Sequence, residues 1–320
     1  MKLFIQIPCK DEEDILPTVL RELPKELVWI TQIEILIIDD WSTDRTLQVA
    51  KEYGVTHIIS FPANRWLGNA FRLGVEYALA HGADILINTD ADNQYPARFI
   101  PALLQPILEH RADIVIGDRT PGKVTHFRWY KKLLQRLGNT IMTLFTWVAI
   151  PDAVSWFRAY SRESLEILNV TVRFSYVIDT ILQAYKKWLM IVRVPITTNP
   201  PTRPSRLFRS IRVHIKKSAA SIIRVYTMYE PFHLFMLASL PFLLVGWWGV
   251  MRFLRYYFMT DSWTWRIQSL IISGILITIG FNLVSLGIIW DVVARNRMLI
   301  EENLRLMKRM SFGDGTESKK

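Results

Sequence analysis

Short apolar, β-branched runs alternate with helix-like segments over the first part of the chain. The apolar runs are residues 3–7, 33–38, 57–59, 85–87 and 114–116, and the helical patterns between them are 14–22, 43–53, 66–81 and 97–110. Strands and helices that take turns at this spacing predict a mostly parallel sheet with helices on both faces. The fold class that we expect is therefore α/β, with a Rossmann-like sheet.

Polar residues follow three of these predicted strands. They occupy residues 8–12 after the first run, 39–44 after the second and 90–94 after the fourth. In open α/β sheets, ligands bind beyond the carboxyl ends of the strands. We therefore expect the three polar segments to meet at one edge of the sheet and to form a binding site there.

Two amphipathic helices are predicted farther along the chain. In 127–148 apolar side chains recur every three or four residues, and basic residues lie in the first half. An ordinary core-facing helix explains this pattern as well as a membrane contact does. In 206–226 the polar side chains are largely basic, which favours a helix that lies on anionic lipid.

Two long stretches, 234–250 and 269–290, carry no charge and are flanked by tryptophans and tyrosines. Each approaches the ~20 residues that cross a hydrocarbon core, and aromatic residues gather at membrane interfaces. A buried hairpin in a soluble core fits less well, because the mean hydropathy of the whole chain is positive. The expected organisation is an α/β domain at 1–205, a basic juxtamembrane helix at 206–232, membrane helices at 233–256 and 268–290, and a tail at 291–320.

The chain has 39 Lys and Arg against 29 Asp and Glu, a net charge of +10. Much of this surplus flanks the two predicted spans, so we expect lipid headgroups and not nucleic acid as the polyanionic partner. The flanks are more basic than the link between the spans, which places the α/β domain and the tail in the cytosol. We expect no signal peptide before the first predicted strand. The single cysteine, Cys9, excludes an intramolecular disulfide and a cysteine-rich metal site.

Asp90 and Asp92 follow a predicted buried strand. Two carboxylates at this spacing can hold one divalent cation between the protein and diphosphate oxygens. An Asp-x-Asp triplet alone is common in surface loops, but consecutive carboxylates, Asp39 and Asp40, end another buried strand. They suit the imide N–H of uracil, the N–H donors of guanine or the hydroxyls of ribose.

Several motifs together resemble the inverting family-2 glycosyltransferases with a GT-A fold, over roughly residues 3–210. They are Ile7-Pro8-x-x-Asp11-Glu12, Ile38-Asp39-Asp40-x-Ser42-x-Asp44-x-Thr46, Asp90-x-Asp92-x-Gln94-x-Pro96 and Ile116-Gly117-x-Arg119. Residues 152–159 and 192–206 are similar to the polyprenyl-phosphate branch, which includes dolichol-phosphate mannose synthase and bacterial undecaprenyl-phosphate glucosyltransferases. The chain departs from the pattern at Lys10-Asp11, Asp118, Arg206 and, above all, Trp156, which replaces the motif glycine.

The resemblance implies a role for each matching residue. Those that would hold the nucleoside are Pro8, Glu12, Asp39 and Asp40. Asp90 and Asp92 would hold Mg²⁺ or Mn²⁺ with the diphosphate, and Gln94 would lie near the sugar–phosphate junction. Arg119, Arg128 and Arg206 would meet phosphates of the donor or acceptor, although for Arg128 a contact with a lipid headgroup is the more common role of a basic residue near a membrane.

The acceptor decides whether a catalytic base is needed. A sugar hydroxyl requires a general base, whereas a lipid phosphate, with a second pKa near ~6, arrives already anionic. Asp152 and Asp179 are the candidates for a base or for orienting the sugar. A place on a solvated helix face is the alternative for Asp179.

The expected function is transfer of one sugar from a UDP- or GDP-linked donor to a polyprenyl phosphate, with inversion, at the cytosolic face of the inner membrane. The resemblance leaves open a homo-oligomer such as a tetramer. One alternative is a membrane transferase that acts on a hydroxyl of a glycolipid or polysaccharide. Processive synthases of that kind usually carry Gln-x-x-Arg-Trp, which is absent here. A second alternative is a non-catalytic nucleotide-binding membrane protein.

Overall fold

The computed structural model describes residues 1–119, 155–170, 176–200, 227, 231–259 and 267–312. The chain forms two compact units: Met1–Arg209 together with Leu304–Lys320, and Ser210–Asn303. The amphipathic helices predicted at 127–148 and 206–226 lie outside the described residues.

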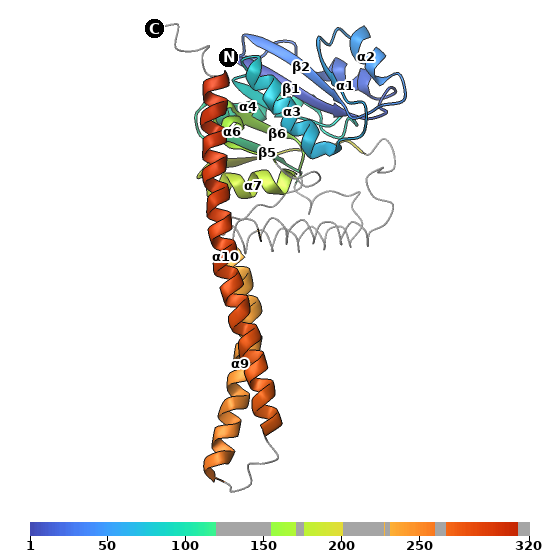
Figure 1. The fold of residues 1–320 in the computed structure, drawn as a ribbon. Coiled ribbons are helices and arrows are strands. Elements are labelled where there is room, and N and C mark those ends of the chain that lie inside the picture. The colour runs from blue at the N-terminus through green and yellow to red at the C-terminus, as the bar shows by residue number, and fades with distance from the viewer. Residues whose placement is uncertain (120–154, 171–175, 201–226, 228–230, 260–266, 313–320) are drawn as a thin grey trace. The chain divides into compact units, whose positions relative to one another are not determined.

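Within the described residues, the first unit is built on a seven-stranded sheet with the order β3-β2-β1-β4-β6-β5-β7 (Figure 1). The strands are β1 Lys2–Cys9, β2 Gln32–Asp39, β3 His57–Ser60, β4 Ile85–Asn88, β5 Ile114–Asp118, β6 Arg158–Ser161 and β7 Ile191–Pro195. All pairings are parallel except those of β6, which runs antiparallel to β4 and β5. The predicted α/β class with a mostly parallel sheet is confirmed, and β6 and β7 are strands that the pattern did not predict.

Helices cover both faces of the sheet because side chains alternate along the buried strands. On β1, Leu3, Ile5 and Ile7 face one apolar cluster, and Phe4 faces the other. The first cluster includes α1 (Leu16–Glu22), α2 (Thr46–Glu52) and α4 (Ile100–Leu108), and the second includes α3 (Trp66–Ala80), α6 (Arg162–Ile167) and α7 (Tyr176–Lys186). The result is a three-layer α/β/α unit.

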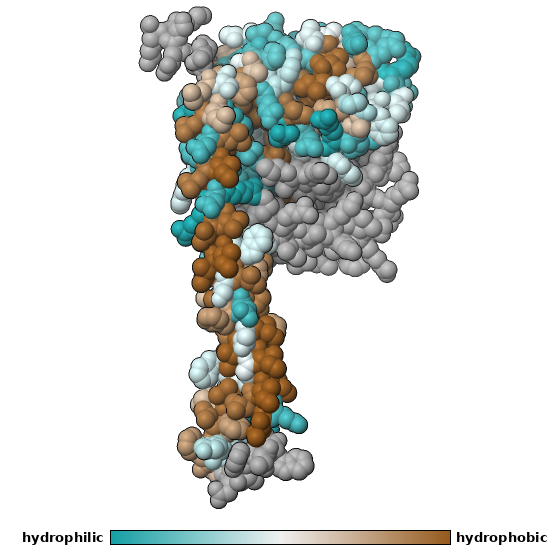
Figure 2. Space-filling view, viewed as in Figure 1, coloured by the Kyte–Doolittle hydropathy of each residue, from teal (hydrophilic) through white to brown (hydrophobic). Residues whose placement is uncertain are grey.

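Two long helices, α9 (Pro231–Met259) and α10 (Ile267–Phe312), contain apolar windows long enough to cross a membrane. Figure 2 shows the apolar side chains that line their surfaces. Only 17% of the window in each helix is buried in the structure, as expected for side chains that face lipid. Length and composition therefore support both predicted spans.

Small residues bring α9 and α10 close together inside the second unit. The buried small residues are spaced seven apart: Ser239 and Gly246 on α9, and Ser273, Gly280 and Gly287 on α10. A Cβ at Gly280 would lie 2.6 Å from Leu243 Cδ2, and one at Gly246 would lie 3.0 Å from the Ser273 carbonyl oxygen. Small side chains at such positions let two helix backbones approach within a membrane.

The segment predicted as a tail at 291–320 is helical as far as Phe312. Its end, from Leu304, belongs to the α/β unit. Lys308 Nζ donates to the Leu168 carbonyl at 3.0 Å, and Arg162 donates to the Phe312 carbonyl at 2.7 Å. Arg309 pairs with Glu166 at 3.2 Å, and burial lowers the pKa of Lys308. The end of α10 is therefore packed as a part of this unit.

Candidate functional site

Three neighbouring parallel strands, β2, β1 and β4, end at one edge of the sheet. After each of them the chain turns through a residue in the left-handed region: Asp11 (φ 52°), Trp41 (φ 68°) and Asn93 (φ 57°). Such conformations are uncommon for residues other than glycine and gather at functional sites. The structure thus brings together the three polar segments that follow these strands.

Hydrogen bonds tie the loops after β1 and β2 to each other. The backbone N–H of Asp11 donates to Ser42 Oγ at 2.9 Å, and the N–H of Thr43 donates to Asp11 Oδ1 at 2.8 Å. The N–H of Glu12 donates to Thr46 Oγ1, also at 2.8 Å. The polar residues of these motifs therefore hold the loops in shape.

Asp39 and Asp40 are buried where β2 ends, with 1% and 6% of their surfaces exposed. Asp39 Oδ1 accepts from the Ser42 N–H at 3.1 Å, and its Oδ2 accepts from Ser60 Oγ at 2.9 Å. Asp40 Oδ1 accepts from the Arg65 N–H at 2.6 Å. Protein donors therefore fix the orientation of both carboxylates.

Asp90 and Asp92 are in a different electrostatic situation. Burial and the neighbouring Asp92 carboxylate raise the pKa of Asp90 to about 8, although Arg119 opposes the shift. Burial also raises the pKa of Asp92, against a hydrogen bond of 3.0 Å that its Oδ1 accepts from the Gln94 N–H. Two crowded carboxylates disfavour their charged forms unless a cation neutralises them.

The donor set at Asp90 and Asp92 fits a divalent cation that also binds substrate. Mg²⁺ keeps an octahedral oxygen shell and uses one or two carboxylates together with phosphates and waters. Among the described residues, no group of three or more His, Cys, Asp and Glu side chains could hold a metal. The pair therefore suits Mg²⁺ or Mn²⁺ shared with a diphosphate, and not a closed structural metal centre.

Four other predicted site residues lie at the same edge or beside it. Pro8 is on β1 opposite Ile38, and the Glu12 carbonyl accepts the Leu16 N–H at 2.9 Å where α1 begins. The Gln94 carbonyl accepts the Asn199 N–H at 3.0 Å. Arg119 directly follows β5, and its charge acts on Asp90.

The model of the glycosyl transferase family 2 matches residues 4–168, which include all three of these strand ends. The chain belongs to glycosyl transferase family 2. This membership confirms the predicted resemblance and the enzyme class.

Relatives of this glycosyltransferase come from bacteria and archaea. A polyprenol monophosphomannose synthase from Mycolicibacterium smegmatis is 28% identical, over 61% of this chain and 77% of the relative. An undecaprenyl-phosphate mannosyltransferase from Micrococcus luteus is 26% identical, over 62% and 83%. A UDP-N-acetylglucosamine–dolichyl-phosphate N-acetylglucosaminyltransferase from Methanococcus voltae is 26% identical, over 61% and 85%.

A solved structure shares the fold of this glycosyltransferase. Glucosyl-3-phosphoglycerate synthase from Mycobacterium tuberculosis, crystallised with Mg²⁺ and uridine diphosphate, matches with a TM-score of 0.52 and 18% identity. The match covers 69% of this chain and 78% of that chain. At this identity the likeness shows the GT-A fold alone.

Asp179 does not lie on a solvated helix face, so that alternative is wrong. It is fully buried on α7, and its Oδ2 accepts from Gln183 Nε2 at 3.0 Å. The contact with Gln183 lies within α7, and the assignment of Asp179 as a base or as a residue that orients the sugar stays a prediction. The other candidate base, Asp152, lies outside the described residues, as do Arg128 and Arg206.

Arg158 belongs to the motif at 152–159, but the sequence assigned it no role and did not predict its burial. It is 1% exposed on β6. Its guanidinium donates to the Ser155 carbonyl at 2.8 Å, to the Val177 carbonyl at 2.9 Å and to Thr180 Oγ1 at 3.0 Å. It thereby joins β6 to the first turns of α7. The available signal was that Arg158 stands between apolar residues in a short segment. This signal is weak, because most arginines in proteins are exposed.

Trp156, which replaces the glycine of the family motif, packs beside β4. Its ring meets Tyr176 edge-on, with centroids 5.1 Å apart. Its carbonyl accepts from Asn88 Nδ2 at 3.1 Å, and its N–H donates to the Tyr95 hydroxyl oxygen at 3.4 Å. These contacts fix residue 156 close to β4, the strand that precedes Asp90.

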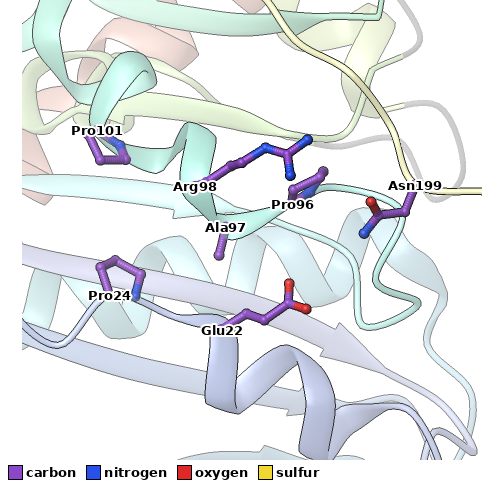
Figure 3. A pocket seen from close by; sticks show the side chains of 7 residues that line it. All are labelled: Glu22, Pro24, Pro96, Ala97, Arg98, Pro101 and Asn199. Atoms are coloured by element: carbon purple, nitrogen blue, oxygen red, sulfur yellow. The ribbon is translucent and has the colours of Figure 1, made fainter.

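A cavity of about 370 Å³ is lined in part by Pro96 and Ala97, which follow the polar segment 90–94 in the chain (Figure 3). None of the predicted site residues lines it. The side-chain amide of Asn199, which lines the cavity, donates to the Asn93 carbonyl at 2.9 Å. Asn199 therefore supports the segment that follows Asp92. The lining residues are Glu22, Pro24, Pro96, Ala97, Arg98, Pro101 and Asn199.

Proposed function

We propose that this glycosyltransferase transfers one sugar, with inversion, from a UDP- or GDP-linked donor to a polyprenyl phosphate, and that it requires Mg²⁺ or Mn²⁺. The observation that carries the proposal is the electrostatic state of Asp90 and Asp92, where burial and mutual repulsion raise the pKa of Asp90 to about 8. A site with two carboxylates in this state is suited to a cation and a diphosphate that bind together.

The relatives support the acceptor more than they support the sugar. Their names share a polyprenol, undecaprenyl or dolichyl phosphate, whereas the transferred sugar is mannose in two of them and N-acetylglucosamine in the third. A lipid phosphate is therefore the acceptor class that we assign. The sugar and the nucleotide base are left to experiment.

On the donor side, Asp39 and Asp40 would accept N–H or O–H groups of the nucleoside, with Pro8 and Glu12 beside them on β1 and its exit. Asp90 and Asp92 would hold the metal, and Gln94 would lie at the sugar–phosphate junction. A bound divalent cation stabilises the charge that develops on a departing nucleoside diphosphate. Arg119 would add a fixed positive charge next to the same phosphates.

On the acceptor side, a phosphate that arrives as an anion needs positioning and charge neutralisation more than it needs a base. Arg128 and Arg206 are the basic residues that we assign to it. The complete burial of Asp179 agrees with a reaction that does not need this carboxylate as a base. Asp152 is the candidate base if the acceptor is a hydroxyl.

The two apolar helices α9 and α10 would anchor the enzyme beside its lipid substrate. Basic residues at the flanks of the spans favour both termini and the catalytic unit on the cytosolic side. We assign the enzyme to the cell membrane on this basis. A homo-tetramer remains a proposal for the purified protein.

The direct test is synthesis of a lipid-linked sugar. Membranes that contain the protein are supplied with radiolabelled UDP- or GDP-sugars, a polyprenyl phosphate and Mn²⁺, and the chloroform-soluble product is counted. We expect product that depends on the lipid phosphate and disappears with EDTA. Product that forms on a glycolipid hydroxyl without the lipid phosphate would replace this proposal with the hydroxyl-acceptor alternative. Nucleotide-sugar binding without any transfer would replace it with the non-catalytic one.

A further inference from the structure

Four tryptophans of the described residues have a left-handed backbone: Trp29 (φ 70°), Trp41 (φ 68°), Trp66 (φ 69°) and Trp188 (φ 57°). A bulky side chain at such a φ is strained. None of the four gains a buried position in return, because their exposed fractions are 78%, 48%, 47% and 91%. Strain without burial calls for an explanation other than packing.

Two of these tryptophans lie next to Asp40. Trp41 directly follows it in the chain. Trp66 directly follows Arg65, whose backbone N–H donates to Asp40 Oδ1 at 2.6 Å. Both therefore stand at the edge of the sheet where the strands end. Trp29 precedes β2 and Trp188 precedes β7, so these two lie at the opposite ends of strands.

A half-exposed indole beside a buried carboxylate offers two kinds of contact at once. The ring is a stacking surface for a flat heterocycle, and the carboxylate accepts its N–H groups. A cation is also present, since Lys10 Nζ lies 5.3 Å from the centroid of the Trp41 ring. A planar N–H donor that carries negative charge on an attached group matches all three features. A nucleobase of a nucleoside diphosphate is such a ligand.

We propose that Trp41 and Trp66 form the aromatic walls of the nucleobase subsite, with Asp39 and Asp40 as the acceptors between them. The proposal rests on the proposed function, because it assigns the base of the same sugar donor. It explains the strained backbones of Trp41 and Trp66, because each keeps an indole exposed where a ligand can contact it. The strain at Trp41 and Trp66 is then a part of the binding site.

The test compares the tryptophans at the two edges of the sheet. Full-length protein in detergent with Mn²⁺ is titrated with UDP, GDP and inorganic pyrophosphate. The site variants are Trp41→Asn and Trp66→Asn, and the controls are Trp29→Asn and Trp188→Asn. Asparagine accepts a left-handed backbone but provides no stacking surface. All four substitutions thus relieve the same strain, and we expect none to lower the thermal unfolding midpoint.

We expect each site variant to weaken binding of the preferred nucleotide by about tenfold or more, as for loss of a stacked base. Binding of pyrophosphate should change less than about twofold, because stacking involves the base alone. Both controls should bind as the wild type does. Trp41→Tyr, which keeps an aromatic ring, should retain most of the nucleotide affinity. It also serves as the second variant if Trp41→Asn does not fold.

Three results would overturn the inference. The first is a wild type that binds UDP or GDP and two site variants that bind it with unchanged affinity. The proposed donor would then still bind at this site, but Trp41 and Trp66 would not contact its base. The second is an equal loss for nucleotide and pyrophosphate. The third is a loss confined to binding of anionic phospholipid vesicles, which would make the two indoles a membrane contact. A wild type that binds neither nucleotide and makes no lipid-linked product would instead remove the proposed function itself.

Discussion

Two pairs of aspartates lie where β2 and β4 end, on either side of β1 in one sheet, and the protein surrounds them differently. Asp39 and Asp40 receive hydrogen bonds from the Ser42 and Arg65 backbones and from the Ser60 hydroxyl. Asp90 and Asp92 crowd each other, and burial with this repulsion raises the pKa of Asp90 to about 8. The residue type is the same, but its surroundings are not.

The difference separates two uses of a carboxylate. Hydrogen bonds from protein donors stabilise the Asp39 and Asp40 carboxylates. These side chains therefore form a rigid set of hydrogen-bond acceptors whether or not a ligand is bound. The charged forms of the second pair are disfavoured by burial, and at Asp90 also by the neighbouring Asp92 carboxylate, so the pair is suited to a cation that arrives with the substrate. Substitutions that exchange these properties test the distinction.

The largest effect is expected for Asp92→Ala. Loss of a metal ligand removes stabilisation of the leaving diphosphate, and we expect sugar transfer to fall by about two to three orders of magnitude. Transfer to polyprenyl phosphate at saturating Mn²⁺ is the measurement. Asp14→Asn is the matched control, because Asp14 is exposed and lies outside the strand ends. Substantial activity in Asp92→Ala at saturating metal would remove Asp92 from the metal site.

Asp39→Asn should destabilise the protein. The Ser42 N–H would then donate to a neutral amide oxygen instead of a carboxylate, and the amide N–H would have to donate to Ser60 Oγ in the reverse direction. Loss of the charged acceptor should cost about 1–2 kcal/mol. Thermal unfolding with EDTA present measures the loss. A midpoint equal to that of the wild type would mean that these hydrogen bonds do not hold the pair.

Asp90→Asn should have the opposite effect on stability when no metal is present. The folded-state pKa of about 8 lies above the ordinary value of 3.8, so the folded state binds the proton more tightly and loses stability as pH rises through this window. The neutral amide avoids that loss. We expect an unfolding midpoint a few degrees above that of the wild type at about pH 8 with EDTA, and a smaller gain at lower pH. A lower midpoint at every pH would contradict the account, whatever the activity of the variant.

Ser60→Ala is the smallest of these changes. It removes one hydrogen bond to Asp39 Oδ2 and should cost about 1 kcal/mol of stability. The KM for the nucleotide sugar should rise while kcat stays nearly constant, because Ser60 orients a nucleoside contact and not the metal. A fall in kcat with an unchanged KM would assign Ser60 to the other pair.

The sequence predicts the three strand ends well because each is a sharp local change, from a β-branched run to consecutive polar residues. The two uses of aspartate could not be predicted in this way. Ser60 reaches Asp39 from β3, and Arg65 reaches Asp40 from the start of α3. These are non-local hydrogen bonds that no spacing reveals.

Other features depend on tertiary packing in the same way. β6 is a strand of four residues that begins with the buried Arg158, and a charged residue argues against a central strand until its partners on α7 are known. Asp179 has Gln183 one turn away on the same helix, which is compatible with either a solvated or a buried face. Only the position of α7 against the sheet decides between them.

The affinity of the metal-free protein for Mn²⁺ as a function of pH tests the central claim most directly. Metal ligation requires both carboxylates without protons. Because the pKa of Asp90 is about 8 without metal, we expect affinity to rise about tenfold per pH unit up to that value and then to level off. Calorimetric titration of full-length protein in detergent gives the profile, with Asp14→Asn as control. An affinity that does not change between about pH 6 and pH 9 would contradict the account, because Asp90 and Asp92 would then not be a pair that awaits a cation.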